Sequence, residues 1–287
     1  HSLSTNRETA MNNTLSVAAI QLTSTSDWQD NLLMAKPLIE AAANEGARLV
    51  VLPENVFLFN GKAMRPLAES DDQSIILRAM SDMAKDCGIY LVIGSHPSVV
   101  REGGSVIEDG RVRQVSWVFG PDGAFLERYD KIHLFDAAVD DKAASYKESD
   151  FIEPGDLSVK VIDVDGFKVG LSICYDLRFP ELYRELVALG AEVLLVPAAF
   201  TYVTGKAHWH TLLSARAIEN QCFVLGVNQC GWHNETRQTY GHSALDSPWG
   251  EPLARLGYEP GYFVCTVAKQ EISDCTQKML CFSHRRL

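Results

Sequence analysis

The sequence has no run of apolar residues that approaches the length of a membrane span. Positive charge is also scarce, because 26 Lys and Arg stand against 37 Asp and Glu, for a formal net charge of -11. A general nucleic-acid surface is therefore not expected, since phosphate binding needs a basic patch. The first ten residues contain no hydrophobic segment, so no secretory signal is expected there.

A paired-cysteine framework is also missing. The seven cysteines are an odd number in a chain of 287 residues, which favours a reducing compartment, the cytoplasm, over a secreted disulfide scaffold. Cys230 and His233 have a spacing seen in zinc sites, but no second pair completes the ligand set. We therefore expect no metal.

The composition is that of a globular protein with a full core, with 46% hydrophobic and 22% charged residues. No internal repeat, linker or low-complexity segment interrupts it. We expect one domain over residues 15–287, preceded by an extension over residues 1–14 that is disordered or foreign to the native chain.

Strand and helix patterns alternate over about the first 225 residues. Many strand patterns are continuous Val, Ile and Leu runs, which indicates burial on both faces. Hairpins are expected around the turns at 120–123 and 165–166, and a β-meander over 240–265. Residues 136–156 show no regular pattern. This arrangement predicts a mixed sheet, or two stacked sheets, with helices outside.

Cys174 ends the apolar run Val169-Gly-Leu-Ser-Ile-Cys174, and a helix pattern opens at Pro180 within a few residues. A strand, tight turn and helix in that order can hold a side chain exposed at the end of a buried strand. The start of a helix also offers unpaired N–H groups, which favour a thiolate. From this segment alone, Cys174 is either a nucleophile or a core cysteine.

Two other strand ends carry ionisable residues. Glu54 follows the run Val50-Val-Leu-Pro, and Lys131 follows the strand pattern that ends at Tyr129. Taken alone, each residue could be a solvated charge. Ligand sites of α/β sheets gather beyond the carboxyl ends of the strands, where a base, an ammonium and a thiol could converge.

Three segments together resemble the signatures of the nitrilase superfamily: Val51-Leu-Pro-Glu54, Arg128-Tyr-Asp-Lys131-Ile-His-Leu-Phe135 and Gly170-Leu-Ser-Ile-Cys174-Tyr-Asp-Leu-Arg178-Phe-Pro-Glu181. The resemblance runs over nearly the whole chain from about Leu15. It implies an α/β fold, a four-layer α-β-β-α sandwich of two mixed sheets flanked by helices. It also implies hydrolysis of carbon–nitrogen bonds without metal or cofactor, and a homodimer.

The resemblance further implies the roles of individual residues. Glu54 would be the general base, Lys131 the oxyanion stabiliser and Cys174 the nucleophile. Glu148 would be a fourth catalytic residue near the lysine, and the backbone N–H of Tyr175 would help to hold the oxyanion.

The substrate is suggested by further segments. Gln229-Cys-Gly-Trp-His233 and Arg237-Gln-Thr-Tyr-Gly-His-Ser243 resemble the branch of the superfamily that acts on deaminated glutathione. That likeness implies a small-molecule substrate with a 2-oxo acid end, held by Arg178 and Thr204, and release of 2-oxoglutarate and cysteinylglycine. The alternatives are an ω-amidase acting on 2-oxoglutaramate and a catalytically silent interaction module. A nitrilase proper is disfavoured, because Tyr175-Asp176 follows Cys174 where Trp-Glu is usual.

Overall fold

The computed structural model describes residues 13–287. The predicted extension over residues 1–14 falls almost entirely on residues 1–12, which lie outside the described residues, and the first strand begins at Thr14. No helix of the described part combines the length and the apolar composition needed to cross a bilayer.

Two six-stranded mixed sheets form the centre of the molecule. The first sheet has the order β16-β1-β2-β3-β4-β5. Its strands are β1 (Thr14–Gln21), β2 (Leu49–Val51), β3 (Tyr90–Ser98), β4 (Arg113–Phe119), β5 (Phe125–Asp130) and β16 (Gly261–Ala268). Strands β1, β2 and β3 run parallel, and the other neighbours are antiparallel.

The second sheet has the order β15-β14-β11-β10-β9-β8. Its strands are β8 (Val161–Val164), β9 (Phe167–Leu171), β10 (Val193–Ala198), β11 (Phe223–Asn228), β14 (Ala244–Asp246) and β15 (Pro252–Arg255). In this sheet β9, β10 and β11 run parallel, and the other neighbouring strands are antiparallel. Both sheets are therefore mixed, as predicted.

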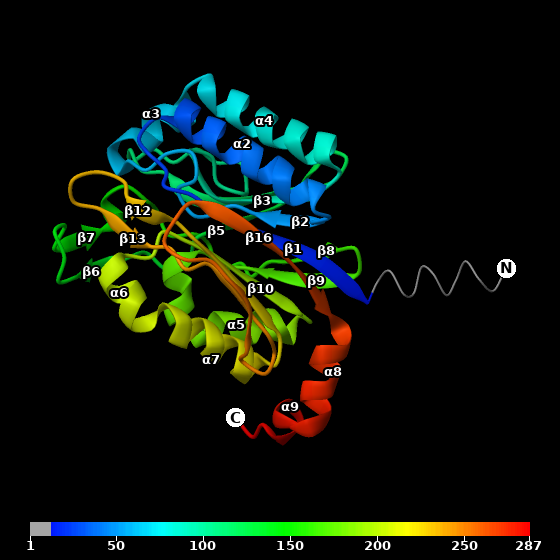
Figure 1. Cartoon of the computed structure of the whole chain (residues 1–287). Coiled ribbons are helices and arrows are strands. Elements are labelled where there is room, and N and C mark those ends of the chain that lie inside the picture. Colours follow the sequence, from blue (N-terminus) through cyan, green and yellow to red (C-terminus); the bar gives the residue numbers. More distant parts are fainter. Residues whose placement is uncertain (1–12) are drawn as a thin grey trace.

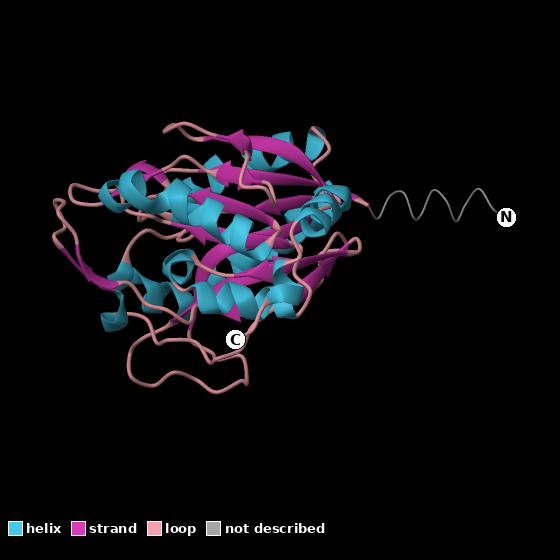
Figure 2. Ribbon diagram, turned by 90° about the horizontal axis from the view of Figure 1, so that it is seen from below, coloured by secondary structure: helices cyan, strands magenta, loops and turns pink. Residues whose placement is uncertain are grey.

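Helices cover the outer face of each sheet. Figure 1 shows α2 and α4 over the first sheet and α5 and α7 beneath the second. Seen from below in Figure 2, helices run across the strands behind them. The α-helices are α2 (Trp28–Asn44), α3 (Met64–Glu69), α4 (Asp72–Cys87), α5 (Pro180–Ala188), α6 (Tyr202–Thr204), α7 (His210–Asn220), α8 (Lys269–Lys278) and α9 (Cys281–His284). The 3₁₀-helices are η1 (Gly61–Ala63), η2 (Glu148–Asp150) and η3 (Cys174–Arg178), and η4 (Gly205–Trp209) is a π-helix directly before α7.

Two hydrophobic cores explain the continuous apolar strands. In β1, Val17 and Ala19 face the core shared by the two sheets, whereas Ala18 and Ile20 face the core beneath α2 and α4. Successive side chains of a strand point to opposite faces, so a strand buried on both sides needs no polar alternation. The four-layer α-β-β-α sandwich is confirmed.

Two segments differ from the sequence-based prediction. The stretch 136–156 contains a small hairpin of β6 (Asp136–Ala138) and β7 (Ser145–Lys147), followed by η2. The predicted meander over 240–265 was wrong in its last strand, because β16 leaves the second sheet and pairs antiparallel with β1 of the first. Another small hairpin joins β12 (Cys230–Trp232) and β13 (Gln238–Tyr240).

Candidate active site

Glu54 lies just beyond the carboxyl end of β2 and is buried. The chain can turn there because Gly94 of β3 carries no side chain. A Cβ at position 94 would lie 2.1 Å from the Leu52 carbonyl oxygen and 2.4 Å from that of Pro53. This close backbone approach fixes the segment that carries the carboxylate.

The carboxylate and backbone of Glu54 are also held from the second sheet. Oε1 accepts a hydrogen bond from the Ala199 N–H at 3.1 Å, just past the end of β10. The Gln229 side chain donates to the Glu54 carbonyl oxygen at 2.9 Å and to the Ser24 hydroxyl at 2.8 Å. Gln229, known from the sequence only as part of a motif, thus positions Glu54.

Lys131 lies one residue beyond β5. Since β5 is antiparallel to β4, and β4 to β3, β5 ends at the same edge of the sheet as β2. The Lys131 side chain is fully buried, and its Nζ lies 2.8 Å from Glu54 Oε2 and 2.8 Å from Glu148 Oε1. The structure thus brings together three of the predicted residues, from positions far apart in the chain.

Glu148 reaches the lysine from η2. Its Oε1 also accepts a hydrogen bond from the Phe135 N–H, and its own N–H donates to the Phe135 carbonyl oxygen, both at 3.2 Å. These bonds hold Glu148 beside Phe135, four residues after Lys131. The part of the 136–156 segment that carries Glu148 is therefore fixed against the site.

Cys174 lies three residues beyond β9, at the first position of η3. Its φ of 45° is in the left-handed region, which a residue with a Cβ rarely adopts. Such strain persists only where the surroundings impose it, and it is concentrated at functional sites. Cys174 is 8% exposed as a whole residue, and the next N–H, of Tyr175, belongs to a first turn whose donors have no intrahelical partner.

Charge and burial set the protonation of the site. Burial raises the pKa of Cys174 well above its ordinary value, as does the Glu54 carboxylate, while Lys131 and the Ala199 N–H act in the opposite direction. Burial lowers the pKa of Lys131, but Glu148 and Glu54 outweigh it and the pKa stands well above normal. Burial likewise raises the pKa of Glu148, opposed by Lys131. The resting site therefore holds an ammonium and a protonated thiol, so attack by sulfur needs a base.

Asp176 is a buried residue that sequence reasoning did not assign to the site. Its Oδ2 accepts hydrogen bonds from the Ile173 N–H at 2.9 Å and the Tyr129 hydroxyl at 2.6 Å. Its Oδ1 accepts from the His133 N–H at 3.2 Å and lies 2.7 Å from His133 Nδ1. One carboxylate thus joins the turn that carries Cys174 to both sides of Lys131. An Asp two residues after the cysteine was the only signal in the sequence.

The remaining predicted residues line a small cavity beside Cys174, which we call the inner pocket. It is lined by Phe135, Cys174, Tyr175, Arg178, Ala199, Phe200, Thr201 and Thr204. The Arg178 guanidinium lies over the Phe200 ring at 5.1 Å and 3.3 Å from His208 Nδ1. No carboxylate of the described residues pairs with it. Arg178 and Thr204 are thus placed where they could contact a substrate bound to Cys174.

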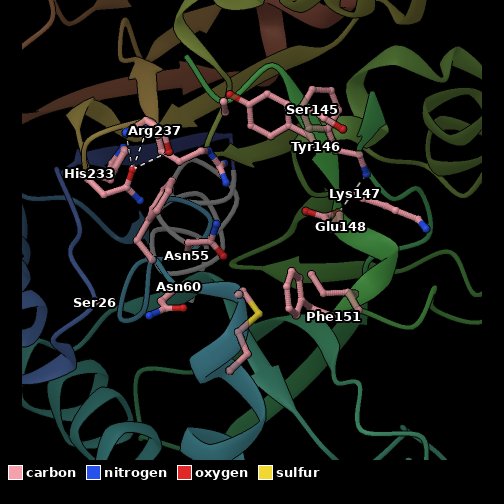
Figure 3. Close-up of a pocket in the computed structure, with 18 of the residues that line it drawn as sticks. Ser26, Asn55, Asn60, Ser145, Tyr146, Lys147, Glu148, Phe151, His233 and Arg237 are labelled. Atoms are coloured by element: carbon pink, nitrogen blue, oxygen red, sulfur yellow. Dashed lines mark hydrogen bonds between the residues drawn. The ribbon is translucent and has the colours of Figure 1, made fainter. Parts of the chain in front are cut away.

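A larger cavity, the outer pocket, adjoins the site on the Glu148 side. Its volume is about 600 Å³. Figure 3 shows Glu148, Tyr146 and Phe151 on one side of the view and His233 and Arg237 on the other. Phe135 lines both pockets, so this residue lies between them. Apart from the motif that contains Arg237, no feature of the sequence indicated this cavity.

Comparison with known proteins gives a consistent result. Residues 16–277 match the family model described as carbon-nitrogen hydrolase. A protein from Synechocystis named deaminated glutathione amidase is 40% identical over 270 residues, covering 93% of this chain and 97% of its own. One from Yersinia enterocolitica with the same name is 41% identical, covering 83% and 82%.

Solved structures agree. The NitFhit protein of C. elegans superposes with a TM-score of 0.86 at 33% identity, over 96% of this chain and 65% of that longer chain. Nit3 of Saccharomyces cerevisiae, a nitrilase superfamily member, gives 0.83 at 29% identity, over 96% and 97%. A mutant of an amidase from Nesterenkonia sp. AN1, with acetamide from fluoroacetamide added covalently at its active-site cysteine, gives 0.77 at 26% identity, over 96% and 98%. This chain belongs to the carbon-nitrogen hydrolase family and is an amidase of the nitrilase superfamily.

Proposed function

We propose that the enzyme hydrolyses deaminated glutathione to 2-oxoglutarate and cysteinylglycine, through a thioester on Cys174. The observation that carries the proposal is the pair of pockets on either side of the catalytic residues, which share the lining residue Phe135. Cys174 lines the inner pocket, which suits the acyl portion, and Glu148 lines the outer pocket, which has room for a dipeptide leaving group. The relatives named for this activity support the assignment.

The first step uses Glu54 and Cys174. Because burial keeps the thiol protonated, Glu54 takes its proton as sulfur bonds to the amide carbon. The electron pair of the C=O bond moves to oxygen. When the C–N bond then breaks, the nitrogen receives the proton held by Glu54 and the amine leaves. The thioester remains on Cys174.

Lys131 stabilises the developing negative charge on oxygen, together with the Tyr175 N–H. Its two carboxylate partners keep it charged, so the ammonium is a fixed donor that needs no reorganisation during the reaction. A donor of this kind is worth on the order of 3 kcal/mol of transition-state stabilisation. Glu148 has the role of holding Lys131 charged and in place.

In the second step Glu54 again acts first as a base and then as an acid. A water molecule enters from the side vacated by the amine, Glu54 takes its proton, and the hydroxide oxygen bonds to the thioester carbon. Breaking the C–S bond releases 2-oxoglutarate, and the proton returns to sulfur. Every atom of this cycle comes from the substrate, one water and the side chains already described.

Arg178 and Thr204 are proposed to hold the 2-oxo acid end. A guanidinium can donate to both oxygens of a carboxylate at once, and Arg178 has no carboxylate partner among residues 13–287. The inner pocket is only about 20 Å³ in this structure. A five-carbon acyl group therefore requires the side chains that close the pocket to move on binding.

The test is product analysis with two substrates. The enzyme is incubated with the keto tripeptide and with 2-oxoglutaramate, and released cysteinylglycine and ammonia are quantified by mass spectrometry. We expect the higher kcat/KM for the tripeptide, and no turnover by Cys174→Ala with unchanged circular dichroism. A higher kcat/KM for 2-oxoglutaramate would assign an ω-amidase instead, and undiminished turnover by the variant would exclude Cys174 as nucleophile. The cytoplasmic location and the homodimer stay predictions.

A further inference from the structure

Arg237 of the outer pocket is a cation that has no carboxylate partner among residues 13–287. Its guanidinium carbon lies 5.1 Å from the centre of the Phe59 ring and 4.8 Å from that of Tyr146. Its Nε is buried and has no hydrogen-bond partner within residues 13–287. A buried donor left unpaired is costly, and an arginine between two aromatic rings is already oriented for a planar anion.

The loop that carries Arg237 is itself well fixed. The Arg237 N–H donates to Asn234 Oδ1 at 2.8 Å, and the His233 N–H donates to the Arg237 carbonyl oxygen at 2.9 Å. Tyr146, whose ring packs against the guanidinium, donates its hydroxyl to Asp141 at 2.5 Å. The guanidinium is thus positioned before any ligand arrives.

The rest of the outer pocket adds positive charge in a chain whose net charge is -11. Lys142 lines the pocket, with its Nζ 4.6 Å from the Trp232 ring centre. Lys147 also lines it and pairs with Asp150 at 3.4 Å. Among the described residues that line the pocket, Glu148 is the one carboxylate, and it is already paired with Lys131. The described wall therefore favours an anion.

We propose that Arg237 binds the terminal carboxylate of the leaving amine and thereby makes the enzyme prefer amides whose amine portion ends in an acid. This rests on the proposed function, in which the scissile amide lies between the two pockets. Deaminated glutathione has a carboxylate at each end, which matches Arg178 on one side of Cys174 and Arg237 on the other. 2-Oxoglutaramate, which releases ammonia, has no second carboxylate and gains nothing from Arg237.

The experiment compares three substrates: the keto tripeptide, the same compound with a C-terminal carboxamide, and 2-oxoglutaramate. For the wild-type enzyme we expect the carboxamide to lower kcat/KM roughly ten- to hundredfold, chiefly through KM, as for loss of a charged hydrogen bond. Arg237→Met should lower kcat/KM for the tripeptide by a similar factor. The Arg237→Met enzyme should also hydrolyse the tripeptide and its carboxamide with nearly equal kcat/KM. Arg237→Lys should keep part of the preference for the carboxylate.

Arg78→Met is the matched control, because it removes one arginine from the exposed face of α4. It should keep the wild-type preference for the carboxylate. The proposal is overturned if the wild-type enzyme does not distinguish carboxylate from carboxamide, a result that needs no variant, or if Arg237→Met distinguishes them as strongly as the wild type. A wild-type enzyme active on neither the tripeptide nor 2-oxoglutaramate would instead refute the proposed function, and this inference with it.

Discussion

Replacing Asp176 with Asn tests how the active site is held together. The carboxylate meets four donors: the Tyr129 hydroxyl, the Ile173 N–H, the His133 N–H and His133 Nδ1. An asparagine of the same shape has one oxygen and one NH₂ group, so its NH₂ must face two of these donors. Whichever way the amide is turned, its NH₂ faces one backbone N–H, of Ile173 or of His133, and that donor loses its acceptor. The second partner on that side, the Tyr129 hydroxyl or His133 Nδ1, can accept from the NH₂ by turning its O–H or changing tautomer.

The expected loss of stability follows from that count. A buried donor without a partner costs about 1–3 kcal/mol, so Asp176→Asn should lower the unfolding free energy by about that amount. Because the carboxylate joins the Cys174 turn to the Lys131 segment, kcat should also fall. Urea denaturation followed by circular dichroism measures the first effect, and amide hydrolysis in the absence of urea measures the second.

Asp82→Asn, on the exposed face of α4, makes the same chemical change at a solvated position and should alter the unfolding free energy by less than about 0.5 kcal/mol. If Asp176→Asn behaved like this control in stability and turnover, the four hydrogen bonds would not hold the site as argued.

Three further changes give distinct expectations. Gly94→Ala places a Cβ against the Leu52 and Pro53 carbonyl oxygens, so we expect about 1–3 kcal/mol of destabilisation in urea and a fall in kcat. Gly103→Ala, with open space around it, should change neither. Lys131→Met should lower kcat about 10²–10³-fold in steady-state assays, and a loss below tenfold would argue against an oxyanion role. Burial raises the pKa of Asp246 to about 6, so the folded state binds more protons than the unfolded chain between about pH 4 and 6 and loses stability as pH rises through that window. Asp246→Asn should therefore raise the unfolding free energy by about 2 kcal/mol at pH 8 but not at pH 3, and an equal effect at both would contradict this.

Much of the fold could be predicted from the sequence because burial leaves a periodic signal. The apolar runs of β1, β2, β3, β10 and β11 indicate strands covered on both faces, and the turn residues at 120–123 and 165–166 mark real hairpins. Strand pairing at long range leaves no such signal. The β16 segment has the same local pattern whether it continues a meander or joins β1, and only the packed structure decides between them.

The part of the site that could be predicted from the sequence consists of residues that lie just beyond the ends of strands. Glu54, Lys131 and Cys174 were suspected for that reason, and the family resemblance made them specific. Glu148 and Arg237 lie in segments whose local pattern suits any solvated charge. Their positions depend on how the 136–156 segment and the β12–β13 hairpin fold against the sheets.

Asp176 was equally hard to predict from the sequence, because it positions the catalytic residues and does not itself react. Its four hydrogen bonds join groups up to 47 residues apart in the chain. A turn-forming Asp after a cysteine is common chemistry, and nothing local distinguishes a surface turn from one buried between two sheets.

The most direct test of the proposed mechanism is to trap the acyl enzyme. The enzyme is mixed with deaminated glutathione, quenched in acid within the first turnover, and analysed by intact-protein and peptide mass spectrometry. We predict one 2-oxoglutaryl group in thioester linkage on Cys174, formed as one equivalent of cysteinylglycine is released. Release of cysteinylglycine with the acyl group on another residue, or with no acyl enzyme at any quench time within the first turnover, would contradict a Cys174 thioester.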